Sequence, residues 1–429
     1  MDTKRWAAVA GGGAVVLAAA TALVALPWSS SGEEPAPAAS PAPPDPPRIG
    51  PERRIALQQA LNRTVAGGSA SGAVAEYTEH NAGGSDTWNG VAGVADRATG
   101  DPVDPQAHFR VASISKPFVA ATVLQLAEEG RLGLDDTLEE LLPGLVEGGR
   151  HITLRMVLSH TSGLYSYNKD MPSVRSDPGR TWRPEELVEI AGAHDPVFAP
   201  GTDVEYSNTN YVLAALVIEE ATGRPYAEEV RERILEPLEL TGTSIPDGLG
   251  VPEPAMHGYA WVSDGAGGRT AEDVTEFDTS RWYGTAQVVS TVSDINTYWR
   301  ALLDGEVLGE EMLQEMLTVQ AYNGGDYGYA LGPRSYTLDC GVQVWMHPGN
   351  IPGHRTWTVH AKDRDLTLFQ ARYAEDPDPP AWAMIETAMC PEQEPGAPSP
   401  GPSTEPSPAP TPYPSEDVEG TGRGRDGGK

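Results

Sequence analysis

The fold of this 429-residue chain is best predicted from one stretch, residues 110–130, which reads RVASISKPFVAATVLQLAEEG. Apolar side chains recur at helical spacing from Phe118 to Leu126, which predicts a helix over 115–129. Gly130 follows it, where a helix commonly ends. Pro117 lies in the first turn, where a missing N–H costs nothing. The stretch therefore predicts that a helix begins next to Ser113.

Ser113 and Lys116 form an S-x-x-K motif at this helix start. The spacing places the ammonium about one helical turn from the hydroxyl, on the same face. A lysine in that position can orient the hydroxyl and, when deprotonated, accept its proton. The same spacing occurs at Ser166 and Lys169, but no helix is predicted there, and we interpret that match as a surface loop. Ser113 is therefore the candidate nucleophile.

Two later segments carry side chains suited to the same chemistry. Tyr206 and Asn208 directly precede a helical pattern at 209–221, so that their phenol and amide could project into a cleft. Residues 347–350 (HPGN) follow the strand-like run 341–346, and their glycine indicates a place where backbone approaches something closely. Taken singly, each segment indicates only a turn or a loop.

Together and in this order, the three segments resemble the serine penicillin-recognising enzymes, whose signature is S-x-x-K, then Y-x-N or S-D-N, then K-T-G or H-x-G. Residues 92–120, 152–165, 200–225 and 340–353 look like the class C β-lactamase-like branch, and most of all like secreted serine D-alanyl-D-alanine carboxypeptidases. The resemblance covers nearly all of 51–392. It implies an α/β (α+β) fold, with an antiparallel sheet flanked by helices, a mostly helical second lobe and an active site in the cleft between them.

The resemblance also implies a role for each matching residue. Ser113 would attack a carbonyl carbon, and Lys116 and Tyr206 would share the proton transfers. The backbone N–H groups of Ser113 and Asn350 would form the oxyanion hole. His347 would complete the catalytic set on the opposite wall. The implied substrate-binding residues are Asn208 for a substrate amide, Trp282 lining the cleft, Arg334 for a terminal carboxylate, and Gly349.

Two positions depart from the carboxypeptidase pattern. The middle residue of the third motif usually bears a hydroxyl that helps to bind the substrate carboxylate, but here it is Pro348, which has neither hydroxyl nor N–H. The residue after the motif glycine, often threonine, is Asn350. These changes bear on recognition of a free carboxylate rather than on acylation of Ser113.

The resemblance predicts a hydrolase that works through an acyl-enzyme, and specifically a D-alanyl-D-alanine carboxypeptidase acting on peptidoglycan stem peptides. A β-lactamase, an esterase or a D-amino-acid amidase would need the same residues, and Pro348 and Asn350 favour the last two. A non-catalytic penicillin-binding sensor is the alternative from another class. A metallohydrolase is disfavoured, because the chain has no H-E-x-x-H and its nine histidines are scattered. We expect no metal and no cofactor.

The charge of the chain limits its partners. A formal net charge of −31 repels a polyanion, which excludes nucleic acid as a partner. We expect a monomer whose partners are a small peptide or β-lactam substrate and cell-wall peptidoglycan.

The two ends of the chain differ in composition from its middle. Residues 1–30 have the basic and apolar pattern of a signal peptide or signal anchor, and 31–50 form a Pro/Ala-rich linker. The hydrolase domain is expected at 51–392, with its helical lobe at about 136–280 and strands within 73–95, 285–291, 341–346, 355–360 and 365–371. Residues 393–429 form a Pro/Ser/Glu-rich tail that we expect to be disordered.

The two cysteines, Cys340 and Cys390, are most simply one disulfide in an exported chain, although two free thiols are the alternative. The pattern predicts a secreted or extracytoplasmic protein, with an N-terminal membrane anchor if the signal is retained.

Overall fold

The computed structural model describes residues 49–66, 68–263, 268–322, 327–373 and 379–391. The expected signal segment, the linker up to residue 48 and the tail at 393–429 lie outside the described residues. Within the described part, no helix has the length and apolar character needed to cross a membrane.

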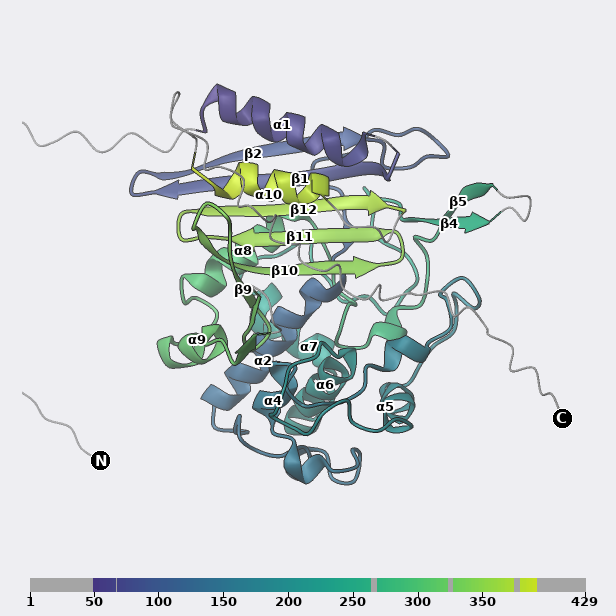
Figure 1. Ribbon diagram of the computed structural model, residues 1–429, viewed down its shortest axis with the longest axis vertical. Coiled ribbons are helices and arrows are strands. Elements are labelled where there is room, and N and C mark those ends of the chain that lie inside the picture. Colours follow the sequence, from purple (N-terminus) through teal and green to yellow (C-terminus); the bar gives the residue numbers. More distant parts are fainter. Residues whose placement is uncertain (1–48, 67, 264–267, 323–326, 374–378, 392–429) are drawn as a thin grey trace, which may run out of the picture. The chain divides into compact units, whose positions relative to one another are not determined.

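An antiparallel sheet unites the two ends of the described chain. Among the described residues it has eight strands in the order β2-β1-β12-β11-β10-β9-β8-β7 (Figure 1). The hairpin expected within 73–95 forms its first two strands, with Ala75 opposite Gly90, and Val74 pairs on the other side with Phe369. The strands are β1 (Ala70–Asn81), β2 (Gly84–Gly93), β7 (Ala321–Tyr322), β8 (Gly328–Tyr329), β9 (Arg334–Thr337), β10 (Gln343–Ile351), β11 (His354–His360) and β12 (Arg364–Arg372).

Helices cover both faces of this sheet. The first and last helices, α1 (Pro51–Val65) and α10 (Pro379–Met389), pack on each other and on one face, where Leu57, Leu61 and Ile385 are fully buried. Helix α8 (Val292–Leu303) packs against the opposite face. This arrangement confirms the predicted fold class, because an antiparallel sheet lies between helices.

A mostly helical region connects β2 to the C-terminal strands. Its central helix α2 (Ser115–Glu128) ends within one residue of its predicted limit and packs on α6 (Asn208–Thr222). Both are apolar on nearly every side, which is typical of helices buried in a core. The other elements are η1 (Ala112–Ile114), α3 (Leu138–Leu141), η2 (Gly149–His151), α4 (Leu154–Leu158), η3 (Tyr167–Asp170), α5 (Pro184–Gly192), α7 (Tyr226–Val230), η4 (Arg231–Leu235), a hairpin of β4 (Tyr259–Ser263) and β5 (Arg269–Asp273), η5 (Thr279–Trp282) and, after α8, α9 (Glu310–Leu317).

The strand expected over 285–291 is mostly wrong. Only Val289–Ser290 (β6) pairs as a strand, with Phe109–Arg110 (β3). The preceding backbone makes other bonds, since the Thr285 carbonyl accepts from Lys116 and the Val288 N–H donates to Ser115 Oγ. Most of this run is therefore bonded to the S-x-x-K segment rather than to a neighbouring strand.

Candidate active site

The S-x-x-K motif places two side chains in direct contact. Ser113 lies in the 3₁₀ turn η1, and Lys116 lies in the first turn of α2. Lys116 Nζ donates to Ser113 Oγ at 2.9 Å and to the Thr285 carbonyl at 3.2 Å. Lys116 is fully buried and Ser113 is 3 % exposed. The hydroxyl is therefore held by a lysine that solvent does not reach.

Tyr206 brings a second proton-transfer group to the same hydroxyl. It stands just before α6, and its phenol donates to Ser113 Oγ at 2.8 Å. Lys116 Nζ lies 4.8 Å from the centre of the Tyr206 ring. Ser113 Oγ is thus within hydrogen-bonding distance of both an amine and a phenol, as a nucleophile that must lose its proton requires.

The Asn208 side chain is buried beside this pair and is available to a ligand. It is 1 % exposed, and neither its amide oxygen nor its amide nitrogen has a partner among the described residues. Buried amides are normally hydrogen-bonded, so both atoms are suited to a substrate amide. Its backbone N–H donates to Ser166 Oγ at 2.8 Å.

The interpretation of the second S-x-x-K match as a surface loop is wrong for its first half. Ser166 is 4 % exposed and supports Asn208, while Tyr167 is fully buried and donates to the Arg281 carbonyl at 2.6 Å. Lys169 faces outward in an ion pair with Glu205 at 2.6 Å. The local sequence at 166–169 does not reveal that Ser166 and Tyr167 are buried, because their burial comes from tertiary contacts.

The third motif lies close to Tyr206, with the ring centres of His347 and Tyr206 6.4 Å apart. His347 is fully buried, and its Nδ1 lies 2.7 Å from the Pro348 carbonyl. A carbonyl only accepts, so Nδ1 carries the proton and Nε2 is left as an acceptor with no partner among the described residues. Burial, followed by the charges of Arg334 and Lys116, lowers the pKa of His347 well below its usual value. The imidazole is therefore neutral.

Gly349 is a position of close approach, as the sequence indicated. A Cβ there would lie 2.2 Å from the Val111 carbonyl oxygen and 3.1 Å from Ala112 Cβ. Strand β10 consequently passes against the turn that carries Ser113, and the next residue of that strand is Asn350. The oxyanion role of the Ser113 and Asn350 N–H groups stays a prediction.

Trp282 and Arg334 lie near the site but are almost enclosed by protein. Trp282 is 3 % exposed and belongs to a small buried cluster that includes Phe277 and Ala112, the residue before Ser113. Arg334 is also 3 % exposed, and its guanidinium carbon lies 4.8 Å from the centre of the Tyr206 ring. The structure brings both to the site as parts of its supporting walls.

One buried residue at the site was missed. His160, within the segment SHTSGL at 159–164, lies against Tyr206 with ring centres 4.4 Å apart. The segment was recognised as similar to the family, but nothing in its spacing points toward Tyr206.

The two cysteines form a disulfide between the end of the sheet and the last helix. Cys340 lies in the turn between β9 and β10, and Cys390 directly follows α10. This is the pairing that the sequence favoured.

One group of side chains has the composition of a cation site. Asp96, His257 and Asp273 each offer a ligand atom within 4.8 Å of the others. These atoms already have partners, since His257 pairs with Asp273 at 2.7 Å and Asp96 accepts from the Tyr259 hydroxyl at 2.9 Å. We assign no ion to this group.

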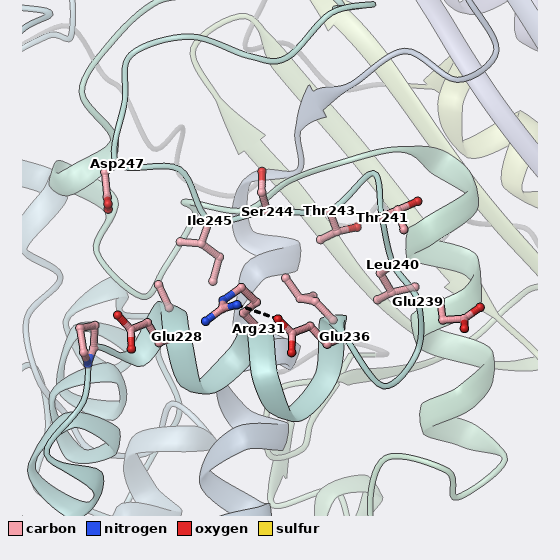
Figure 2. Close-up of a pocket in the computed structure, with 13 residues that line it drawn as sticks. Glu228, Arg231, Glu236, Glu239, Leu240, Thr241, Thr243, Ser244, Ile245 and Asp247 are labelled. Carbon is pink, nitrogen blue, oxygen red and sulfur yellow. Dashed lines mark hydrogen bonds and ion pairs between the residues drawn. The ribbon is translucent and has the colours of Figure 1, made fainter.

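A surface groove of about 910 Å³ lies beside α7 and η4, and it shares no residue with the candidate site (Figure 2). Acidic side chains surround it, and Arg231 is held there by Glu236 at 2.6 Å. The groove contains none of the residues that the motifs selected.

Comparison with known proteins agrees with this geometry. The family model described as beta-lactamase matches residues 57–372. The chain is 26 % identical to penicillin-binding protein 4* of Bacillus subtilis, over 71 % of this chain and 69 % of that protein. Its fold is similar to a D-stereospecific amidohydrolase from Streptomyces sp., with a TM-score of 0.71 and 37 % identity over 79 % of this chain and 98 % of that chain. It is also similar to the D-amino acid amidase from Ochrobactrum anthropi, with a TM-score of 0.70 and 28 % identity over 78 % and 98 %.

Proposed function

The chain belongs to the β-lactamase family and is a serine hydrolase, and within this family we propose that it hydrolyses the amide bond that follows a D-amino-acid residue. The single observation that supports an amide-terminated substrate is the wall formed by His347 and Pro348. The preference for a D-residue is supported by the two amidohydrolase structures with a similar fold.

His347 and Pro348 offer an acceptor, and neither side chain supplies a hydroxyl or a positive charge to a carboxylate. Free carboxylates are held by cationic groups, hydroxyls or N–H groups. Here the imidazole is neutral, its proton faces the Pro348 carbonyl, and proline contributes neither hydroxyl nor N–H. The free Nε2 of His347 can instead accept from the N–H of an amide. An uncharged terminus therefore suits this wall better than a carboxylate.

The residues around Ser113 account for both halves of the reaction. Ser113 Oγ bonds to the carbonyl carbon of the D-residue, and its proton passes to Lys116 or Tyr206. The C–N bond then breaks, and the leaving nitrogen takes that proton, which gives ammonia or an amine and an ester on Ser113. A water molecule attacks this ester and returns the proton to Ser113 Oγ, which releases the acid. The Asn208 amide is placed to bind the substrate backbone during both steps.

A D-alanyl-D-alanine carboxypeptidase is the second candidate. It is favoured by Arg334, whose guanidinium carbon lies within 4.8 Å of the Tyr206 ring centre. This candidate lacks the hydroxyl that these carboxypeptidases usually have in the third motif, because the middle residue there is Pro348. We therefore rank it below the amidohydrolase.

The two candidates are separated by a matched pair of substrates. An N-acylated D-alanyl-D-alanine with a free carboxylate is compared with the same peptide as its C-terminal carboxamide, alongside D- and L-phenylalanine amide. We expect kcat/KM for the carboxamide to exceed that for the carboxylate by about 10-fold or more. The carboxylate would enter the site without a charge-assisted contact from His347 or Pro348, and one such contact corresponds to a ratio of about that size. D-Phenylalanine amide should react and its L-isomer should not.

A Ser113→Ala variant is the control for every substrate. Preference for the free carboxylate would instead establish the carboxypeptidase. Benzylpenicillin, followed by intact mass, tests the remaining alternatives: rapid turnover would indicate a β-lactamase. A stable Ser113 adduct without hydrolysis of any amide or of p-nitrophenyl acetate would indicate a penicillin-binding sensor.

We also propose that the protein acts outside the cytoplasm. The disulfide between Cys340 and Cys390 is typical of an oxidising compartment, and the apolar run near residue 1 has the composition of an export signal. Protease accessibility on intact cells tests this location.

A further inference from the structure

His160 occupies a backbone position that glycine normally takes. It follows α4 with φ +62°, its N–H donates to the Val157 carbonyl at 3.3 Å, and the Thr161 N–H donates to the Met156 carbonyl at 2.9 Å. This is the Schellman pattern of helix termination, in which the left-handed residue is usually glycine because a Cβ is disfavoured there. A strained residue beside an active site points to a role for its side chain.

His160 holds the backbone on both sides of Tyr206. The Glu205 N–H donates to the His160 carbonyl at 3.1 Å, and the Ser207 N–H donates to His160 Nδ1 at 3.2 Å. Between these two bonds the imidazole lies against the Tyr206 ring, with ring centres 4.4 Å apart and planes inclined by 36°. One residue thus restrains the main chain and the ring of the phenol that contacts Ser113.

The hydrogen bonds define the imidazole as a neutral acceptor at Nδ1. Asn210 Nδ2 also lies 3.3 Å from this nitrogen, and Ser162 Oγ donates to Asn210 Oδ1, which turns the amide nitrogen toward the ring. A proton on Nδ1 would face two donors. Burial, together with the charges of Arg334 and Lys116, lowers the pKa of His160 well below its usual value, in agreement with this assignment.

We propose that His160 is a positioning residue that sets the Tyr206 phenol at hydrogen-bonding distance from Ser113 Oγ. It is 3 % exposed, and its Nδ1 and its carbonyl both accept from backbone N–H groups next to Tyr206, so we expect it to act through Tyr206 rather than on the substrate. The proposal rests on the serine hydrolase chemistry alone and is independent of which amide the enzyme cleaves.

Two substitutions in the full-length protein separate positioning from stability. His160→Gly removes the ring but suits the left-handed backbone, so the helix end should remain intact. His160→Asn tolerates this backbone and places an acceptor oxygen near the position of Nδ1. Glu239→Gly is the matched control, because Glu239 also has positive φ (54°) but lines the distant groove of Figure 2.

Hydrolysis of p-nitrophenyl acetate is the probe, because it reports on Ser113 without requiring a D-residue. We expect His160→Gly to lower kcat by about 10- to 100-fold with little change in KM, as displacement of a reacting group by about 1 Å does. Its Tm should fall only modestly, because relief of the left-handed backbone offsets part of the stability lost with the buried ring. His160→Asn should recover most of kcat, and Glu239→Gly should leave kcat unchanged.

A crystal structure of His160→Gly gives a second, substrate-independent readout. We expect the distance from the Tyr206 hydroxyl to Ser113 Oγ to lengthen beyond about 3.5 Å, where a hydrogen bond is lost. An unchanged distance together with parental kcat would overturn the proposal. The proposal would also be overturned if the glycine variant and the asparagine variant lost kcat to the same extent and Tm to the same extent. That result would show a purely structural role for His160.

Discussion

Gly349→Ala tests whether strand β10 and the nucleophile turn must touch for catalysis. The added methyl would lie 2.2 Å from the Val111 carbonyl oxygen and 3.1 Å from Ala112 Cβ. The first contact is with backbone, which cannot rotate away as a flexible side chain can. The strand and the turn that carries Ser113 must therefore separate.

The size of this separation follows from the contact distance. A carbon and a carbonyl oxygen approach to about 3.3 Å, so the two segments must move apart by about 1 Å. Displacement of a reacting group by that amount costs about 100-fold in rate. Overpacking of a buried contact costs a further 1–3 kcal/mol or so of stability. We expect kcat to fall by about two orders of magnitude while the protein still folds.

Steady-state hydrolysis of D-phenylalanine amide and of p-nitrophenyl acetate measures the rate, and thermal unfolding measures the stability. Gly192→Ala is the matched control, because nothing lies within 4 Å of a Cβ at that residue in α5. It should leave kcat unchanged and should not lower Tm, since alanine is favoured over glycine in a helix.

Parental kcat in Gly349→Ala would refute this reasoning. It would mean that the strand and the turn move together, so that the alignment of Ser113 does not depend on their contact. A loss of kcat accompanied by an equal loss in Gly192→Ala would also refute it, because the effect would then be general to added methyl groups.

Three further outcomes follow from the geometry. Lys116→Met should lower the rate of Ser113 acylation by about 10²- to 10⁴-fold, as loss of a positioned proton-transfer group does, and pre-steady-state kinetics with p-nitrophenyl acetate measures it. Cys340→Ser combined with Cys390→Ser opens a loop of 50 residues and should cost about 4 kcal/mol in urea unfolding without changing kcat. Burial lowers the pKa of His354 to about 3, so its contribution to stability is complete above about pH 6.5 and decreases as the pH falls toward 3. His354→Leu should therefore flatten the acid side of the stability curve by about 1.4 kcal/mol per pH unit, and urea midpoints between pH 4 and 7 or so would test it.

The fold was predictable because its signals are local. The hairpin of β1 and β2 has two strand-like runs joined by a glycine-containing turn, and the limits of α2 are marked by its apolar spacing and by Gly130. The run at 285–291 has similar local signals, but its backbone is bonded to Lys116 and Ser115. Those partners lie 169 and 173 residues away along the chain, so no local pattern reports them.

The site was predictable only in part for the same reason. Ser113 and Lys116 are joined by one helical turn, which spacing alone can specify. Tyr206 reaches Ser113 across 93 residues, and only the order of the motifs indicated it. The roles of Trp282 in lining the cleft and of Arg334 in binding a carboxylate stay predictions from the resemblance; both side chains are 3 % exposed, and that burial depends on neighbours from distant segments.

Backbone strain adds a constraint that the sequence does not display. Ala112, directly before Ser113, has φ +55°, and His160, which restrains Tyr206, has φ +62°. Each left-handed non-glycine residue costs roughly 1 kcal/mol or more relative to glycine. The Ser113 hydroxyl and the Tyr206 phenol are thus each held by a strained residue. Glycine could end the helix or form the turn at these positions without this cost to stability. The pattern is expected if the contact between Ser113 and Tyr206, rather than the stability of either segment, determines which residues occupy these two positions.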